Sequence, residues 1–444
     1  MENNIFEQDS LFRTYMKLSL PVVLGCVATI IYNMADTFFI ALTGNTELIA
    51  AVSLCAPVFS IMMAFGNILG HGGSSLISRL FGSNNIKETR HVSSFCFYIS
   101  IVIGAVIGVL MLLFAGPFLS LLGANEETIV YARDYYKWLA YGAPLIIPTF
   151  APLNQLRCEG LSGVSMLCNV AGLVLNIILD PILIFTFGMG AAGAAIATVL
   201  GYVLSDILYV LAVVKKSRIM SMSIFDFKVS AGEIRQIFSV GVSAAITNWM
   251  TSIYLIIINH FLLPYGNDQI AAMGIVQKIT SIIIMLLVGF SFGASPIFGY
   301  FYGQHNKAKL LELFRLVMNF IAILGAVLCL IIFITASPLI RMFLSDPSLI
   351  ETGALMLRLQ VITMTTAGVI IVITILFQSA GMGMIASLIS VCRQGIIFLI
   401  SIFIMSAFFG YMGILTAQIA ADIISTVIAF LCFYRFYMPK LKAM

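Results

Sequence analysis

The strongest constraint on this chain is a series of apolar stretches, each long enough to cross a lipid bilayer. A membrane-spanning helix needs about 20 mostly apolar residues. Twelve stretches of the 444-residue sequence meet this requirement: 18–41, 48–70, 92–115, 131–155, 162–187, 191–214, 237–263, 270–291, 314–336, 351–378, 384–408 and 413–436. Charged residues make up only 9% of the chain, whereas a soluble protein has about 25%. The sequence therefore predicts an all-α integral membrane protein, and it has no basic cluster typical of nucleic-acid binding.

The distribution of Lys and Arg predicts the orientation in the membrane. Of the 23 basic residues, 17 fall in the termini or in the even-numbered connections between the predicted spans. Positively charged connections stay on the cytoplasmic side. We therefore expect a multi-pass protein of the cell (inner) membrane with both termini in the cytoplasm.

An internal repeat divides the chain into two halves. A shift of 221 residues places Ile49-Ala-Ala51 on Ile270-Ala-Ala272 and Gly72–Gly82 on Gly293–Gly303; near the end of each half the shift becomes 220. Each copy holds six predicted spans, an even number, so the copies have the same orientation and are related by an axis along the membrane normal. We expect an N-terminal six-helix lobe with a cation site over 1–214, a cytoplasmic linker over 215–236 and a C-terminal six-helix lobe over 237–444.

Two carboxylates lie inside apolar spans. Asp36 is in the first span, and Asp180 is in the fifth, four residues after Asn176 and directly before a proline. An ionisable group in hydrocarbon costs several kcal/mol, so it marks a functional site by default. The alternative is that each acid is only hydrogen-bonded among packed helices.

Several motifs resemble the multidrug and toxic compound extrusion (MATE) family, in its DinF-like branch of small bacterial and archaeal members. They are Asn33-Met-Ala-Asp36-Thr37, the Gly72–Gly82 segment with its second copy, Leu156-Arg-Cys-Glu-Gly160 and Asn176-Ile-Ile-Leu-Asp180-Pro181. The resemblance implies twelve transmembrane helices in two pseudo-symmetric six-helix lobes that form a V-shaped cavity. It also implies export of organic cations in exchange for Na⁺ or H⁺, and a cation site at Asp36, Asn176, Asp180 and Thr198.

The depth of these residues supports one shared site. Counted from the outer ends of their spans, Asp36, Asp180 and Thr198 lie about 7–11 Å below the outer surface, and Asn176 lies one turn deeper. Their oxygen atoms suit Na⁺ as a hard cation. Two close carboxylates also suit a proton, and the sequence does not choose between the two ions.

Five other polar residues in the spans are candidates for substrate binding or coupling: Tyr32, Asn33, Asp206, Lys278 and Asp422. Tyr32 is one turn before Asp36 and either braces its carboxylate or is an ordinary core tyrosine. Asp206 and Asp422 either attract a cationic substrate or make a polar contact between helices. Lys278 either pairs with an acid such as Asp422, replaces a cation in the C-terminal lobe, or extends to the interface.

These features favour a secondary antiporter over the alternatives. A flippase for lipids or lipid-linked oligosaccharides needs a basic cavity, and only Lys278 and Arg393 are embedded in the spans. An intramembrane aspartyl protease suits a pair of acids, but the repeat counts against it. We therefore expect no enzyme activity and no cofactor apart from Na⁺ or H⁺ as the coupling ion. The expected partners are small organic cations and the lipid bilayer, with no nucleic acid, and the protein is expected to be a monomer.

Overall fold

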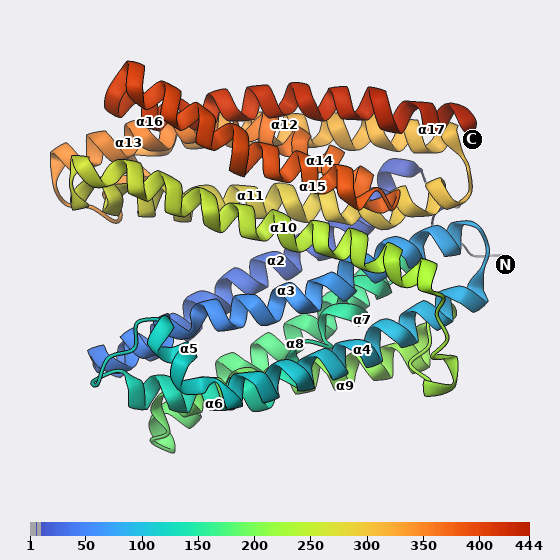
Figure 1. Cartoon of the computed structure of the whole chain (residues 1–444), viewed down its shortest axis with the longest axis horizontal. Coiled ribbons are helices and arrows are strands. Elements are labelled where there is room, and N and C mark those ends of the chain that lie inside the picture. The colour runs from blue at the N-terminus through green and yellow to red at the C-terminus, as the bar shows by residue number, and fades with distance from the viewer. Residues whose placement is uncertain (1–5, 7–9) are drawn as a thin grey trace. The chain divides into compact units, whose positions relative to one another are not determined.

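The computed structural model describes residue 6 and residues 10–444, and these are helical almost throughout (Figure 1). The chain forms two compact units. The first contains Leu20–Gly241, and the second contains Ser10–Ser19 and Val242–Met444. Tyr15 explains why the start of the first helix belongs to the second unit: its hydroxyl donates to the Phe290 carbonyl at 3.2 Å.

The first unit is a bundle of long helices and two shorter pieces. Its elements are α2 (Leu11–Leu42), α3 (Thr46–Gly82), α4 (Ile86–Leu113), α5 (Ala115–Leu121), α6 (Ile129–Ile146), α7 (Phe150–Gln155), the 3₁₀ turn η1 (Leu156–Glu159), α8 (Ser162–Pro181), the π-helix η2 (Ile182–Thr186) and α9 (Gly190–Lys216). The packing centres on α9, which lies against α8 and α6, while α6 also packs on α3 and α4.

The second unit has the same plan. Its elements are most of α10 (Ala231–Leu262), the 3₁₀ turn η4 (Leu263–Tyr265), α11 (Asn267–Gly303), α12 (Lys307–Arg341), α13 (Pro347–Ile362), α14 (Met364–Ser379), α15 (Gly383–Val391), the π-helix η5 (Cys392–Ile396), α16 (Ile397–Cys432), the π-helix η6 (Phe433–Tyr437) and α17 (Met438–Ala443). The 3₁₀ turn η3 (Ile224–Asp226) and the start of α10 belong to the first unit. Here α14 packs on α11, α12, α15 and α16.

All twelve predicted spans are helical, although several are interrupted. Among the described residues, nine helices are long and apolar enough to cross a membrane, and α13 with α14 makes a tenth, bent by 40°. One of the nine is the stretch Gly383–Ala443, but it contains two predicted spans, because Gly410 (φ 56°, ψ −130°) turns the chain within it. The fourth predicted span is divided into α6 and α7 at 147–149. The predicted all-α membrane fold is confirmed.

The repeat is visible in the backbone itself. Helices α3 and α11 both have 37 residues and occupy matching positions. Each is followed by a residue with positive φ, Asn84 and His305, and then by an Asn whose side chain caps the next helix. Because positive φ is uncommon for residues other than glycine, the matching turns support a common structural unit.

The segment that connects the two halves is bound to the first unit. Three hydroxyl groups of α4 donate to its backbone: Ser93 to the Ser221 carbonyl, Ser94 to the Ser223 carbonyl and Tyr98 to the Met222 carbonyl, at 2.7–2.9 Å. Glu159 accepts hydrogen bonds from the Ser217 hydroxyl and the Arg218 backbone N–H. Burial raises the pKa of the Glu159 carboxyl, and these hydrogen bonds oppose the rise.

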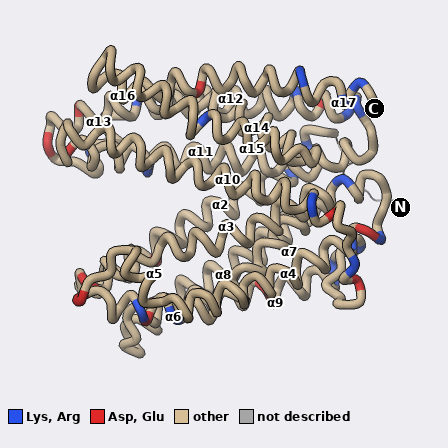
Figure 2. The backbone as a smooth tube through the Cα atoms, in the orientation of Figure 1, with Lys and Arg blue, Asp and Glu red and all other residues tan. Residues whose placement is uncertain are grey.

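Basic residues gather at one end of each unit. Figure 2 shows most Lys and Arg of each unit at the same end of that unit's helices. This is the distribution that the positive-inside rule associates with a cytoplasmic face.

Candidate cation site

Asp180 lies at the end of α8, at the level where the regular helix gives way to η2. Its side chain is 0% exposed, and neither carboxylate oxygen has a hydrogen-bond partner among the described residues. Pro181 follows it and has no backbone N–H, so the helix cannot continue its hydrogen bonding there without adjustment. A π-helix, frequently found at functional sites, takes over at Ile182.

Asp36 comes to the same place from α2. Its Oδ1 atom is buried and has no hydrogen-bond partner among the described residues. The two carboxylates, Asp36 and Asp180, are close enough to act on each other electrostatically. The structure therefore brings together the two acids that the sequence singled out.

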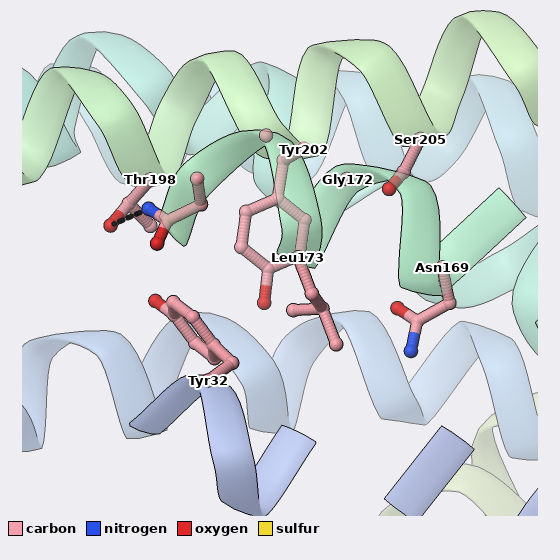
Figure 3. A pocket seen from close by; sticks show the side chains of 9 residues that line it. Tyr32, Asn169, Gly172, Leu173, Thr198, Tyr202 and Ser205 are labelled. Carbon is pink, nitrogen blue, oxygen red and sulfur yellow. Dashed lines mark hydrogen bonds between the residues drawn. The ribbon is translucent and has the colours of Figure 1, made fainter. Parts of the chain in front are cut away.

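Asn176 and Thr198 join them from α8 and α9. Asn176 Nδ2 donates to Thr198 Oγ1 at 3.3 Å, and the Thr198 hydroxyl donates to the Ala194 carbonyl at 3.0 Å. Because the amide nitrogen is used in this way, the Asn176 Oδ1 atom is left as a buried acceptor without a partner in the described part of the chain. Tyr32 points its hydroxyl toward Thr198 (Figure 3).

The site therefore has an excess of acceptors. Four buried oxygen atoms lack a donor among the described residues: Asp36 Oδ1, Asn176 Oδ1 and both oxygens of Asp180. Burying an unpaired carboxylate is very costly, and the cost is removed only by a counter-charge or by protonation. These atoms are hard oxygen ligands, so the donor set fits Na⁺ as well as a proton.

Two glycines hold α8 and α9 together beside this cluster. A Cβ atom at Gly172 would meet the Ser205 hydroxyl and the Gly201 carbonyl. The absence of a side chain at this point lets the helices approach closely enough for Asn176 to reach Thr198. A cavity of about 10 Å³, lined by Tyr32, Asn176, Thr198 and Tyr202 among others, adjoins the cluster. This is roughly the room that one water molecule needs.

One residue of this site was missed at the sequence level. Tyr135 of α6 is 8% exposed and lies near enough to both Asp36 and Asp180 to feel their charges. Nothing in the sequence separates it from the other aromatic residues of the fourth span, because its position near the acids depends on how α6 packs within the bundle.

The remaining candidates lie elsewhere. Asn33 and Lys278 are exposed. Asp206 accepts a hydrogen bond from the Thr149 hydroxyl at 2.7 Å, at the break between α6 and α7. Asp422 is paired with Arg393, not with Lys278, at 2.8 Å. The suggested pairing of Lys278 with Asp422 is therefore wrong, because Arg393 occupies that carboxylate from inside the second unit.

A helical membrane fold of two repeated units, with two acids of the first buried and unpaired among the described residues, defines a polytopic membrane transporter. The chain belongs to the MatE family, whose model matches residues 21–182 and again 243–404. The two matches fall on the two copies of the repeat.

Curated relatives and solved structures agree with this assignment. The chain is 31% identical over 387 residues to the multidrug export protein MepA of Staphylococcus saprophyticus, covering 87% of this chain and 85% of that protein. It is 30% identical over 386 residues to the protein of the same name from Staphylococcus haemolyticus, with the same coverage. A crystal structure of a MATE protein in the bent conformation superposes with a TM-score of 0.93 at 24% identity, covering 100% of this chain and 99% of the other. An outward-facing multidrug resistance MATE transporter gives 0.92 at the same identity and coverage.

Proposed function

We propose that this protein is a secondary active multidrug exporter that moves lipophilic organic cations out of the cell in exchange for Na⁺ or H⁺. The coupling ion binds in the first unit, to the oxygens of Asp36, Asn176 and Asp180, with Thr198 orienting the amide. The protein works as a monomer in the cell (inner) membrane, with both termini in the cytoplasm and no cofactor. The multidrug export named for the MepA relatives supports the substrate class.

The observation that carries this proposal is the surplus of buried acceptors around Asp180. An acid kept only for packing is expected to receive hydrogen bonds from its neighbours. Asp180 instead keeps both oxygens without a donor among the described residues and interacts electrostatically with a second carboxylate, Asp36. Such a pair is stable only while it holds a positive charge, so its occupancy responds to the ion gradient.

Coupling follows from differential affinity. An ion that binds one conformation more tightly than the other shifts the balance between them, and it can shift the balance only by that difference. The change from α-helix to π-helix directly after Asp180 is a place where ion binding can change the hydrogen bonding and direction of the helix. Reciprocal coupling then makes ion binding and drug binding oppose each other.

The flippase alternative is not favoured. A phosphate-binding cavity needs free basic groups, but Arg393 is neutralised by Asp422 within its own unit. Of the two basic residues embedded in the predicted spans, only Lys278 then remains to bind a phosphate, and one lysine does not make a basic cavity.

The test is ethidium efflux from proteoliposomes under an imposed Na⁺ gradient, and separately under an imposed pH gradient. The wild type is expected to respond to at least one gradient, and the Asp36→Asn and Asp180→Asn variants to neither, because each substitution keeps the shape and removes the charge. Asp134→Asn, which changes an exposed acid of α6, is the matched control and should behave as the wild type. Efflux at the wild-type rate from either site variant contradicts the proposal.

A further inference from the structure

The second unit contains a polar pocket at the repeat position of the small cavity that adjoins the cation site. The repeat pairs Gly172 with Arg393, Leu173 with Gln394, Thr198 with Gln418 and Tyr202 with Asp422. All four positions line the small polar cavity of their own unit. We call the group formed by Tyr254, Gln277, Gln360, Arg393, Gln418 and Asp422 the Arg393 pocket.

Arg393 reaches this pocket from a π-helical turn that interrupts its α-helix. The residue lies in the π-helix η5, between α15 and α16. In the first unit the equivalent position is Gly172, where no side chain fits between α8 and α9. A π-helix inserts an extra residue into the turn and changes the direction of its side chains. The second unit thus places a guanidinium at the position where the first unit has Gly172 packed directly against Ser205 and Gly201 of α9.

The guanidinium is bound to a carboxylate that the first unit lacks. Arg393 Nε donates to Asp422 Oδ1 at 2.8 Å, and their side chains are 11% and 1% exposed. Gln418 Nε2 donates to the same Asp422 oxygen at 2.8 Å. The ionisable groups that line the pocket around Asp422 are Arg393 and Tyr254, and Lys278 does not line it.

The rest of the pocket is rich in oxygen ligands. Gln418 Oε1 is buried and has no hydrogen-bond partner among the described residues, and Gln418 is 6% exposed. Gln277 Nε2 donates to the Tyr254 hydroxyl at 3.0 Å, and this hydroxyl donates in turn to Gln360 Oε1 at 3.4 Å. The cavity between these groups is about 30 Å³, room for one or two water molecules. Carboxylate, amide and hydroxyl oxygens around such a space are the ligands of a hard cation.

We propose that Arg393 is a tethered cation that permanently takes the place of a mobile cation at Asp422, beside the unpaired amide oxygen of Gln418. The side chain delivers the positive charge that the first unit takes from solution. The second unit therefore binds no coupling ion while Arg393 is present. Removing the guanidinium uncovers a site at Asp422 that takes a proton or Na⁺.

The test is the unfolding temperature of the full-length protein in detergent, with Na⁺ exchanged for choline at constant ionic strength and with pH varied from 5 to 8. It is done in the Asp36→Asn/Asp180→Asn background, so the first site contributes nothing and export activity is not needed. The result is therefore independent of the proposed function. Adding Arg393→Ala is expected to make Na⁺ or acid raise the unfolding temperature by roughly 2 °C or more, as for any ligand that binds only the folded state.

Two further variants make the result specific. Arg393→Lys keeps a tethered charge and should show no gained response. Arg393→Ala combined with Asp422→Asn removes the carboxylate and should lose the response. Equal responses from Arg393→Ala with and without Asp422→Asn overturn the proposal. So does failure of Arg393→Ala to fold in both Na⁺ and acid, because a mobile cation then cannot replace the guanidinium.

Discussion

Each half of the molecule has a small polar cavity at a matching position of the repeat, but the two halves neutralise their buried acids in different ways. In the first unit Asp36 Oδ1, Asn176 Oδ1 and both oxygens of Asp180 are buried without a hydrogen-bond donor among the described residues. In the second unit the positions of Asp36, Asn176 and Asp180 are taken by Ile257, Ile397 and Ser401. The buried acid there, Asp422, is bonded to Arg393 and Gln418.

Under the proposed function, the first unit takes its positive charge from solution, whereas the buried acid of the second unit is neutralised by an arginine of its own unit. Both units share the helical frame, including the turns at Asn84 and His305. The frame therefore does not require the acids of the first unit. The two copies of the repeat share their architecture, but the first contains two acids, Asp36 and Asp180, that are unpaired among the described residues, and the second contains the ion pair Arg393–Asp422.

The largest effect is expected on export, from Asp180→Ser, which replaces Asp180 by the residue type found at its repeat position, Ser401. The serine matches Ser401, so it suits the fold, but it removes the charge that we propose binds the coupling ion. We expect ion-driven ethidium efflux from proteoliposomes to fall to the level of protein-free vesicles. The control is Asp134→Ser at an exposed position, which should retain efflux. Efflux by Asp180→Ser at the wild-type rate would show that the two units do not differ in ion binding at this position.

The second effect is on stability, from Asp422→Asn. Removing one partner of a buried ion pair typically costs about 3–5 kcal/mol, because the other charge is left uncompensated. We expect the free energy of unfolding to fall by that order, measured by denaturant titration in mixed micelles.

Two comparisons sharpen this second prediction. Glu312→Gln, at an exposed position of α12, should change stability by less than about 0.5 kcal/mol. Replacing both partners, with Arg393→Met and Asp422→Leu, should restore much of the loss, since an apolar pair leaves no buried charge. A loss from Asp422→Asn no larger than that from Glu312→Gln means that Arg393 does not depend on this carboxylate.

A third, smaller effect is expected from Gly172→Ala in the first unit. The new methyl group would meet Ser205 and the Gly201 carbonyl, so α8 and α9 must separate, at a cost of roughly 1–3 kcal/mol. The separation also lengthens the contact between Asn176 and Thr198. Thermal unfolding should show the loss, while Gly163→Ala in the same helix, where a Cβ has open space, should be neutral or stabilising.

The smallest expected effect concerns the caps at two turns that the repeat pairs, at Asn125 and Asp346. In the first unit the Asn125 side chain accepts hydrogen bonds from the backbone of Glu127 and Thr128. In the second unit Asp346 accepts them from the backbone N–H and hydroxyl of Ser348, and these bonds hold the pKa of the Asp346 carboxyl below its usual range.

A carboxyl whose pKa is lowered on folding stabilises the protein above its unfolded pKa of about 3.9. That contribution is lost as the pH falls through the folded pKa. We therefore expect the hydrogen-exchange protection factors of the amides at the start of α13 to fall below about pH 4. The amides after Asn125 should show no such change. Asp346→Asn should remove the pH dependence; if the dependence persists, another group causes it.

The sequence alone determined the membrane class, the twelve helical segments, the internal repeat and the two acids in the first half. These follow from local length, apolar composition and the cost of a charge in hydrocarbon, which need no knowledge of packing. Only the tertiary structure decided which groups meet. The Arg393–Asp422 pair depends on a π-helix that redirects a side chain, and Tyr135 reaches the acids because α6 packs beside them. The approach of Asn176 to Thr198 depends on two glycines on neighbouring helices. Such contacts join residues far apart in the chain, and their geometry is set by the packing of whole helices.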